Sequence, residues 1–147
     1  MAKYRSRLEA VLFQLNNRVE AARAGLAEIN RRVTEGEAGL ARLRNDVKKS
    51  CQAMADPDSR GLLPGDLDEI YRYIRTLRKL ETEGESALEN LLIEHERERE
   101  ALARAMKEHD VVQKIENRHF QAYLSRLEKK EQQMTDELAG QLKRGNR

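Results

Sequence analysis

The sequence predicts an all-α fold: an antiparallel two-helix coiled-coil hairpin with a C-terminal helical overhang. Three observations predict it: a long heptad stripe in the first third of the chain, a cluster holding both prolines, and a second helical pattern that outlasts the first. Charged residues make up 37% of the chain and aromatic residues 4%, a mixture typical of long solvated helices. Residues 1–147 are therefore assigned to a single coiled-coil domain.

The first helix is expected over about 4–55. From Leu8 to Met54, apolar residues recur at steps that alternate strictly between four and three. A mean spacing of about 3.5 residues keeps a narrow stripe on one side of a supercoiled helix. Gly36 and Ser50 interrupt the apolar character of this stripe. The pattern predicts a rod-like coiled coil rather than a globular core.

A turn is expected over 56–65, where Pro57 and Pro64 disfavour helix at the residues before them. The second helix is expected over about 66–142, with Asp66 as its N-cap and Glu69 completing a capping-box-like signal. Its seam contains more polar residues than that of the first helix. Near residue 116 the apolar spacing shifts in a stutter, which locally unwinds a supercoil.

The linker between the helices favours antiparallel pairing within one chain. A fold-back centred near residue 60 places Gly36 opposite Gly84, where the backbones could approach closely or form a soft joint. The second helix then outruns its partner from about residue 120, and an unpaired amphipathic helix needs a docking surface. The predicted seam comprises Leu12, Val19, Leu26, Val33, Leu40, Val47, Ile74, Leu77, Leu88 and Leu102.

The sequence does not favour an enzyme. The glycines are not followed by the Lys-Ser/Thr of a phosphate loop, and the three histidines are too dispersed to share a metal. The net charge of +2 does not suggest nucleic-acid binding. Apolar runs fall far short of the roughly 20 residues of a membrane span, and the single Cys51 fits a reducing compartment. We expect a cytoplasmic protein without cofactor, metal or membrane insertion.

Aromatic residues gather towards the two ends of the expected hairpin. Near the turn lie Tyr71 and Tyr73, and at the open end lie Tyr4, Phe13, Phe120 and Tyr123. These residues could cap the two ends of the bundle, or they could anchor partners there, since exposed aromatic residues are common at interfaces. The sequence leaves both interpretations open.

Three stretches resemble the FliJ/YscO family, the small coiled-coil stalk proteins of flagellar and type III secretion export. The opening at 4–12 is similar to an aromatic-x-x-Arg-Leu-x-x-Val-Leu motif. The segment 70–80 resembles an aromatic-Ile-x-x-Leu block, and 128–139 is similar to a Glu-x-x-x-x-Asp-Glu-x-Ala pattern. The opening motif resembles flagellar members more than injectisome members.

The resemblance implies a non-enzymatic central stalk. Its terminal helices would enter a hexameric export ATPase, and its turn-side half would contact the cytoplasmic domain of the export gate at the inner membrane. Export chaperones are a further implied partner. Gate-binding positions would be Tyr73, Leu77 and Leu80, whereas Gly84 departs from the polar residue of some members. ATPase-binding positions would be Leu8, Leu12, Glu131, Asp136 and Glu137.

A generic homodimeric coiled-coil tether or spacer is the alternative function. It predicts a dimer that depends on concentration, whereas the stalk predicts a monomer in isolation. The interrupted seam of the second helix and the well-marked turn favour the monomer.

Overall fold

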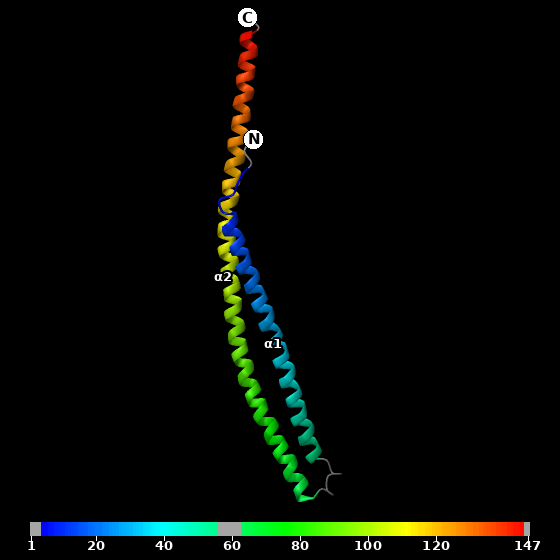
Figure 1. The fold of residues 1–147 in the computed structure, drawn as a ribbon. Coiled ribbons are helices and arrows are strands. Elements are labelled where there is room, and N and C mark those ends of the chain that lie inside the picture. Colours follow the sequence, from blue (N-terminus) through cyan, green and yellow to red (C-terminus); the bar gives the residue numbers. More distant parts are fainter. Residues whose placement is uncertain (1–3, 56–62, 146–147) are drawn as a thin grey trace. The chain divides into compact units, whose positions relative to one another are not determined.

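The computed structural model describes residues 4–55 and 63–145, which contain two long helices that pack against each other (Figure 1). Helix α1 spans Glu9–Ala55 and helix α2 spans Pro64–Gly145. Over these ranges the chain contains no strand. The predicted all-α helical hairpin is therefore confirmed.

The chain divides into two compact units. The turn-side unit is Ala22–Leu102, and the terminal unit combines Met1–Ala21 with Ala103–Arg147. In each unit a part of α1 packs against a part of α2.

The core of the turn-side unit is a single seam between its two helical segments. Its four most buried apolar side chains, 5–8% exposed, are Ile29, Leu40, Ile74 and Leu77. Further predicted seam residues are partly buried, namely Leu26, Val33, Val47, Leu88 and Leu102. Among the described residues no large side chain is fully buried, because each helix of a two-helix bundle has one neighbour to cover it.

Two seam glycines of this unit lie against leucines and not against each other. A Cβ atom placed on Gly36 would lie 3.5 Å from Leu88 Cδ1, and one on Gly84 would lie 3.5 Å from Leu40 Cδ1. The expected close approach of Gly36 to Gly84 is therefore not observed, because neither glycine has an atom within 4 Å of a Cβ placed on the other. Each leucine occupies the space beside a glycine of the opposite helix, and this fit favours the observed register. Both distances are ordinary contacts, so close backbone approach does not require either glycine.

Arginine–glutamate pairs line the edge of this seam. Arg44 bridges the helices, with its Nε atom 3.2 Å from Glu81 Oε1 and its Nη2 atom 3.0 Å from Glu85 Oε1. Arg31 pairs within α1 with Glu28 and Glu35, at 2.6 Å to each. Such exposed pairs add little stability, although the Arg44 pairs are consistent with the register that the leucines set.

Helix α2 begins at Pro64, two residues before the expected N-cap at Asp66. The carbonyl of Leu63 accepts hydrogen bonds from the backbone N–H groups of Asp66, at 2.9 Å, and Leu67, at 3.3 Å. Proline suits the first helical position because its missing N–H would have no partner there. The expected turn at 56–65 thus ends before Pro64, and its residues 56–62 lie outside the described part of the chain.

In the terminal unit, α1 begins at Glu9 and not near residue 4 as expected. Ser6 Oγ accepts a hydrogen bond of 3.1 Å from the backbone N–H of Leu8. A serine side chain that satisfies a backbone donor in this way favours a helix start over a helix interior. Residues 4–8 are therefore a non-helical segment, which we call the N-terminal strap. Leu15 and Val19 of α1 form the apolar core of this unit.

The predicted C-terminal overhang is present. Every described residue from 128 onward is exposed, and α2 continues to Gly145, beyond the expected end near 142. The overhang begins after Leu127 and not near residue 120. The reason is the strap, whose Tyr4 ring lies 5.2 Å from the rings of both Phe120 and Tyr123. Over the described residues, neither helix has a stretch long and apolar enough to cross a membrane.

Candidate partner-binding surfaces

The turn-side unit exposes two tyrosines near the start of α2. Tyr71 is 52% exposed and Tyr73 is 53% exposed. Leu80, about two turns further along, is 44% exposed, whereas Leu77 is 6% exposed and lies in the seam. Of the gate-binding positions implied by the family resemblance, Tyr73 and Leu80 are therefore accessible to a partner, whereas Leu77 is not.

Two shallow hollows lie between the end of α1 and the start of α2. Tyr73 and Ile70 line the first, together with Ser50 and Ala53 of α1. Tyr71 and Ile74 line the second, together with Cys51 and Met54 of α1. Each hollow has an exposed tyrosine beside aliphatic side chains, and charged residues complete the lining: Asp66 and Glu69 in the first, Arg75 and Arg78 in the second. Apolar anchors with charged residues around them are typical of protein–protein contacts.

The terminal unit uses its aromatic residues differently. The Tyr4 hydroxyl donates a hydrogen bond of 2.6 Å to Glu116 Oε1. The Tyr4 ring meets Phe120 edge-on, at 66°, and Tyr123 at a tilt of 43°. These contacts hold the strap on α2, so here the aromatic residues cap the bundle, as one of the two interpretations predicted. Phe13 is the exception, because it is 67% exposed.

Glu116, which accepts the hydrogen bond of Tyr4, is a buried charged residue with 9% of its surface exposed. Hydrogen bonding by the Ser6 hydroxyl, and then by the Tyr4 hydroxyl, holds the pKa of Glu116 below its ordinary value, although burial opposes this effect. The same Tyr4–Glu116 hydrogen bond raises the pKa of Tyr4. This pair was not predicted from the sequence. A glutamate at a seam position of the second helix, together with a tyrosine just before the heptads of the first, could have indicated it.

The overhang carries an exposed apolar stripe. Met134, Leu138 and Leu142 are 64%, 60% and 71% exposed, and their spacing of four places them along one face of the helix. Of the ATPase-binding positions implied by the family resemblance, Glu131, Asp136 and Glu137 are exposed on the same overhang. Leu8 and Leu12 are partly buried within the terminal unit.

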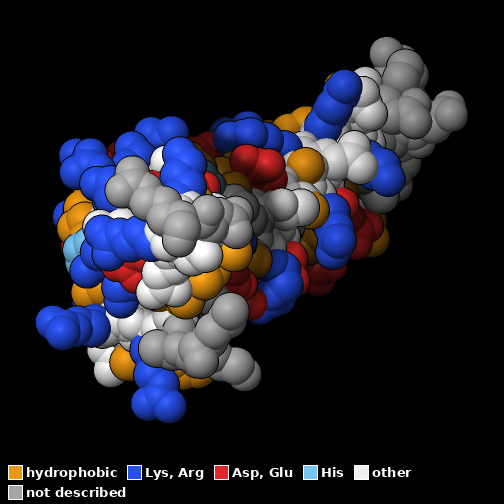
Figure 2. All heavy atoms as spheres, turned by 90° about the horizontal axis from the view of Figure 1, so that it is seen from above, with side chains coloured by type: hydrophobic (Ala, Val, Ile, Leu, Met, Phe, Trp, Pro, Cys, Tyr) orange, Lys and Arg blue, Asp and Glu red, His pale blue; other side chains and the backbone are white. Residues whose placement is uncertain are grey.

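Charged side chains of both signs cover the face seen in Figure 2, with hydrophobic side chains between them. Within the described residues, no group of three His, Cys, Asp or Glu side chains is arranged to hold a metal ion.

A comparison with family models decides the family. The model of the flagellar FliJ protein matches residues 4–147. This chain belongs to the FliJ family. A solved structure described as a YscO homolog from Chlamydia trachomatis is also similar, with 22% identity, 99% coverage of this chain, 100% coverage of that chain and a TM-score of 0.47. No curated protein matches.

FliJ-family membership assigns the chain to flagellar and type III protein export, which is the functional class that the sequence predicted. Proteins of this family are structural components of export and not enzymes.

Proposed function

We propose that this FliJ-family chain is the non-enzymatic central stalk of a flagellar export apparatus, on the cytoplasmic face of the inner membrane. In this proposal its overhang enters a hexameric export ATPase, and its turn-side tyrosines contact the cytoplasmic domain of the export gate. Export chaperones are a further proposed partner, for which no surface is assigned.

The observation that carries the proposal is the uncovered stripe of Met134, Leu138 and Leu142. A helix of this length without a packing partner is marginal in water, and a row of exposed large apolar side chains indicates an interaction site. The narrow stripe suits insertion between other helices or loops. The carboxylates of Glu131, Asp136 and Glu137 are exposed on the same overhang, and they supply polar contacts to a partner that surrounds the helix.

The turn-side unit supports a second, separate contact. Tyr73 and Leu80 are exposed apolar anchors close to the hollows at the end of α1. Leu77 contributes to this contact indirectly, because its burial in the seam positions the surface that carries the other two.

Pairing within one chain favours a monomer over the homodimeric tether. The apolar stripe of α1 is already covered by α2 in the turn-side unit, where Leu40 lies against Gly84 and Leu88 against Gly36. A second copy would therefore find no open α1 seam to pair with along this unit.

The proposal is tested by adding the purified chain to its cognate export ATPase at one stalk per six ATPase subunits. We expect the chain to promote hexamer formation and to raise ATP turnover. Met134→Asp combined with Leu138→Asp should reduce the stimulation at least about tenfold, since charge on the stripe opposes its burial.

The matched control is Gln132→Asp combined with Gln133→Asp, which adds the same charge to exposed positions of the overhang on the side of the helix away from the stripe. We expect this control to retain most of the stimulation. Equal losses in both variants, or no effect of the unaltered chain on hexamer formation and turnover, would contradict the proposal.

A further inference from the structure

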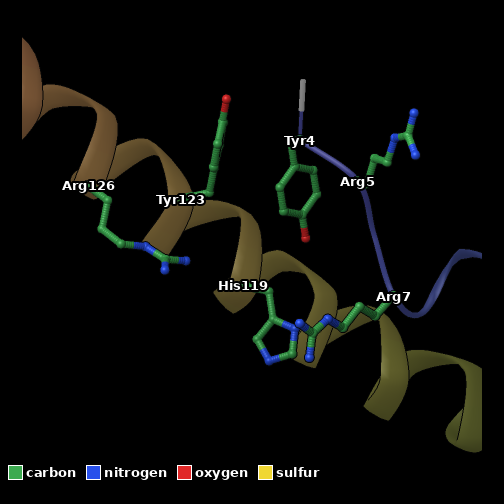
Figure 3. A pocket seen from close by; sticks show the side chains of 6 residues that line it. All are labelled: Tyr4, Arg5, Arg7, His119, Tyr123 and Arg126. Atoms are coloured by element: carbon green, nitrogen blue, oxygen red, sulfur yellow. The ribbon is translucent and has the colours of Figure 1, made fainter. Parts of the chain in front are cut away.

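An open groove separates the N-terminal strap from α2 in the terminal unit (Figure 3). The strap contributes Tyr4, Arg5 and Arg7, and α2 contributes His119, Tyr123 and Arg126. Its volume of about 400 Å³ falls within the range of roughly 300–1,000 Å³ that is typical of ligand sites. The groove exists because Tyr4 is fixed to Glu116 and Phe120, which holds the strap beside α2.

The groove is lined by arginines that form no ion pair with another described residue. Neither Arg5 nor Arg7 makes a hydrogen bond or ion pair with another described residue. Arg126 donates from Nε to the Ala122 carbonyl at 3.4 Å, which leaves the outer nitrogens of its guanidinium available. In Figure 3 the Arg7 side chain extends towards His119, whereas Arg5 points away from α2 at the rim.

Glu116 is a carboxylate beside the groove, and it forms no ion pair with the groove arginines. Its Oε1 atom accepts the hydrogen bond of Tyr4, and its charge acts on His119. Elsewhere in the chain, exposed arginines such as Arg31, Arg44 and Arg99 do pair with glutamates. The groove therefore combines available guanidinium groups with two tyrosine rings, a composition typical of protein-interface hot spots.

We propose that this groove binds an acidic segment of a partner protein. Guanidinium groups match the planar geometry of aspartate and glutamate carboxylates and can bind them through two hydrogen bonds. The rings of Tyr123 and His119 line the same groove, where they can pack against the aliphatic part of such a side chain. Nucleic acid is disfavoured because it requires a continuous basic stripe, whereas this chain has a net charge of +2 and 26 acidic residues.

This contact is distinct from the apolar stripe of the overhang, so it holds whether or not the overhang binds the ATPase. The test uses the full chain and a fluorescently labelled twelve-residue peptide of alternating glutamate and serine. Fluorescence anisotropy should show binding that weakens as salt rises. In NMR spectra the peptide should shift the signals of Tyr4, His119 and Tyr123. A peptide with glutamine in place of glutamate should not bind.

Arg7→Gln combined with Arg126→Gln should weaken peptide binding at least about tenfold. Arg42→Gln combined with Arg97→Gln removes the same charge from exposed positions in the turn-side unit and should change binding by less than about twofold. Circular dichroism before each titration verifies that both variants are folded. Three outcomes would overturn the proposal: equal weakening in both variants, tighter binding of a single-stranded oligonucleotide or an anionic vesicle than of the peptide, or a peptide response at other residues.

Discussion

The two units of this protein use similar residue types in opposite ways. In the turn-side unit, Tyr71 and Tyr73 are about half exposed and lie beside open hollows. In the terminal unit, Tyr4 packs against Phe120 and Tyr123, and these contacts fix the strap to α2. The groups available to a partner there are instead the arginines of the groove and the apolar stripe of the overhang.

Aromatic residues at the two ends of this coiled coil therefore have different roles. Tyr4 donates a hydrogen bond from its hydroxyl to the buried carboxylate of Glu116, and it stabilises the fold. Tyr73 has no such buried partner among the described residues and presents its ring to solvent, where it can serve as an anchor. Two different surfaces on one chain suit a protein that connects two different partners.

The largest expected effect is on the free energy of unfolding, and it distinguishes a buried seam leucine from an exposed leucine of the turn-side unit. Leu77→Ala should reduce the free energy of unfolding by about 2 kcal/mol or more, because a buried leucine is truncated. Leu80→Ala, at an exposed position one turn away, should change it by less than about 0.5 kcal/mol. Urea denaturation of both variants measures the difference. Similar losses would show that the two leucines do not differ in burial as described.

The second prediction concerns binding to the export gate by the exposed turn-side residues. Tyr73→Ala combined with Leu80→Ala should weaken binding to the cytoplasmic domain of the export gate about tenfold, a loss of roughly 1.4 kcal/mol. Leu92→Ala combined with Ile93→Ala is the control, because those side chains are 48% and 49% exposed on the same unit. Isothermal titration should find the control close to the unaltered chain. A comparable loss in the control would remove any special role for Tyr73 and Leu80.

The third prediction concerns the glycines of the turn-side seam. Gly84→Ala should stabilise the protein by up to about 1 kcal/mol, because alanine is the better helix former and its Cβ would meet Leu40 at an ordinary contact distance of 3.5 Å. Thermal unfolding followed by circular dichroism measures the change. Destabilisation would indicate that the helices approach more closely at Gly84 than the structure shows.

The smallest expected effect tests the strap of the terminal unit. The pKa of Glu116 lies below its ordinary value of 4.5 when folded, so its contribution is present above that value and is lost as pH falls through the lowered pKa. The pKa of Tyr4 lies above its ordinary value of 10.0, so its contribution is present below pH 10 and is lost as pH rises through the raised pKa. NMR signals of the Tyr4 and Phe120 rings should therefore report release of the strap at both extremes.

Glu116→Gln is the control for this release, because it removes the acid titration while leaving an amide oxygen that can accept from Tyr4. The acid-induced change of the Tyr4 and Phe120 signals should disappear in this variant. Persistence of the same transition would place its origin outside the Tyr4–Glu116 pair.

Heptad spacing was sufficient to predict the two helices, because a mean apolar spacing of about 3.5 residues is the pattern of a supercoiled α-helix. It could not predict the register. A seam stays on the same face of each helix whatever the axial shift between them, and the choice depends on how Leu40 and Leu88 fill the space beside Gly84 and Gly36. The expected Gly36–Gly84 pairing came from placing the centre of the fold-back near residue 60.

The sites were predictable only in part. Exposed Met134 and Leu138 follow from the overhang, since they continue an apolar stripe beyond the partner helix. The fold-back centred near residue 60 placed Tyr4 at the same end as Phe120 and Tyr123, which lie against it in the structure. The non-helical strap, its hydrogen bond to Glu116 and its groove were not predicted, because Tyr4 precedes the periodic region and bonds Glu116 across 112 positions of sequence. No local pattern encodes a contact of that separation.

The central claim is that the two units present surfaces to two different partners. Its most direct test places a photoreactive benzoylphenylalanine at position 73 or at position 138 in living cells and identifies the protein crosslinked to each. We expect position 73 to crosslink to the export gate and position 138 to the export ATPase. Crosslinking of both positions to one protein, or to a second copy of this chain, would contradict the account.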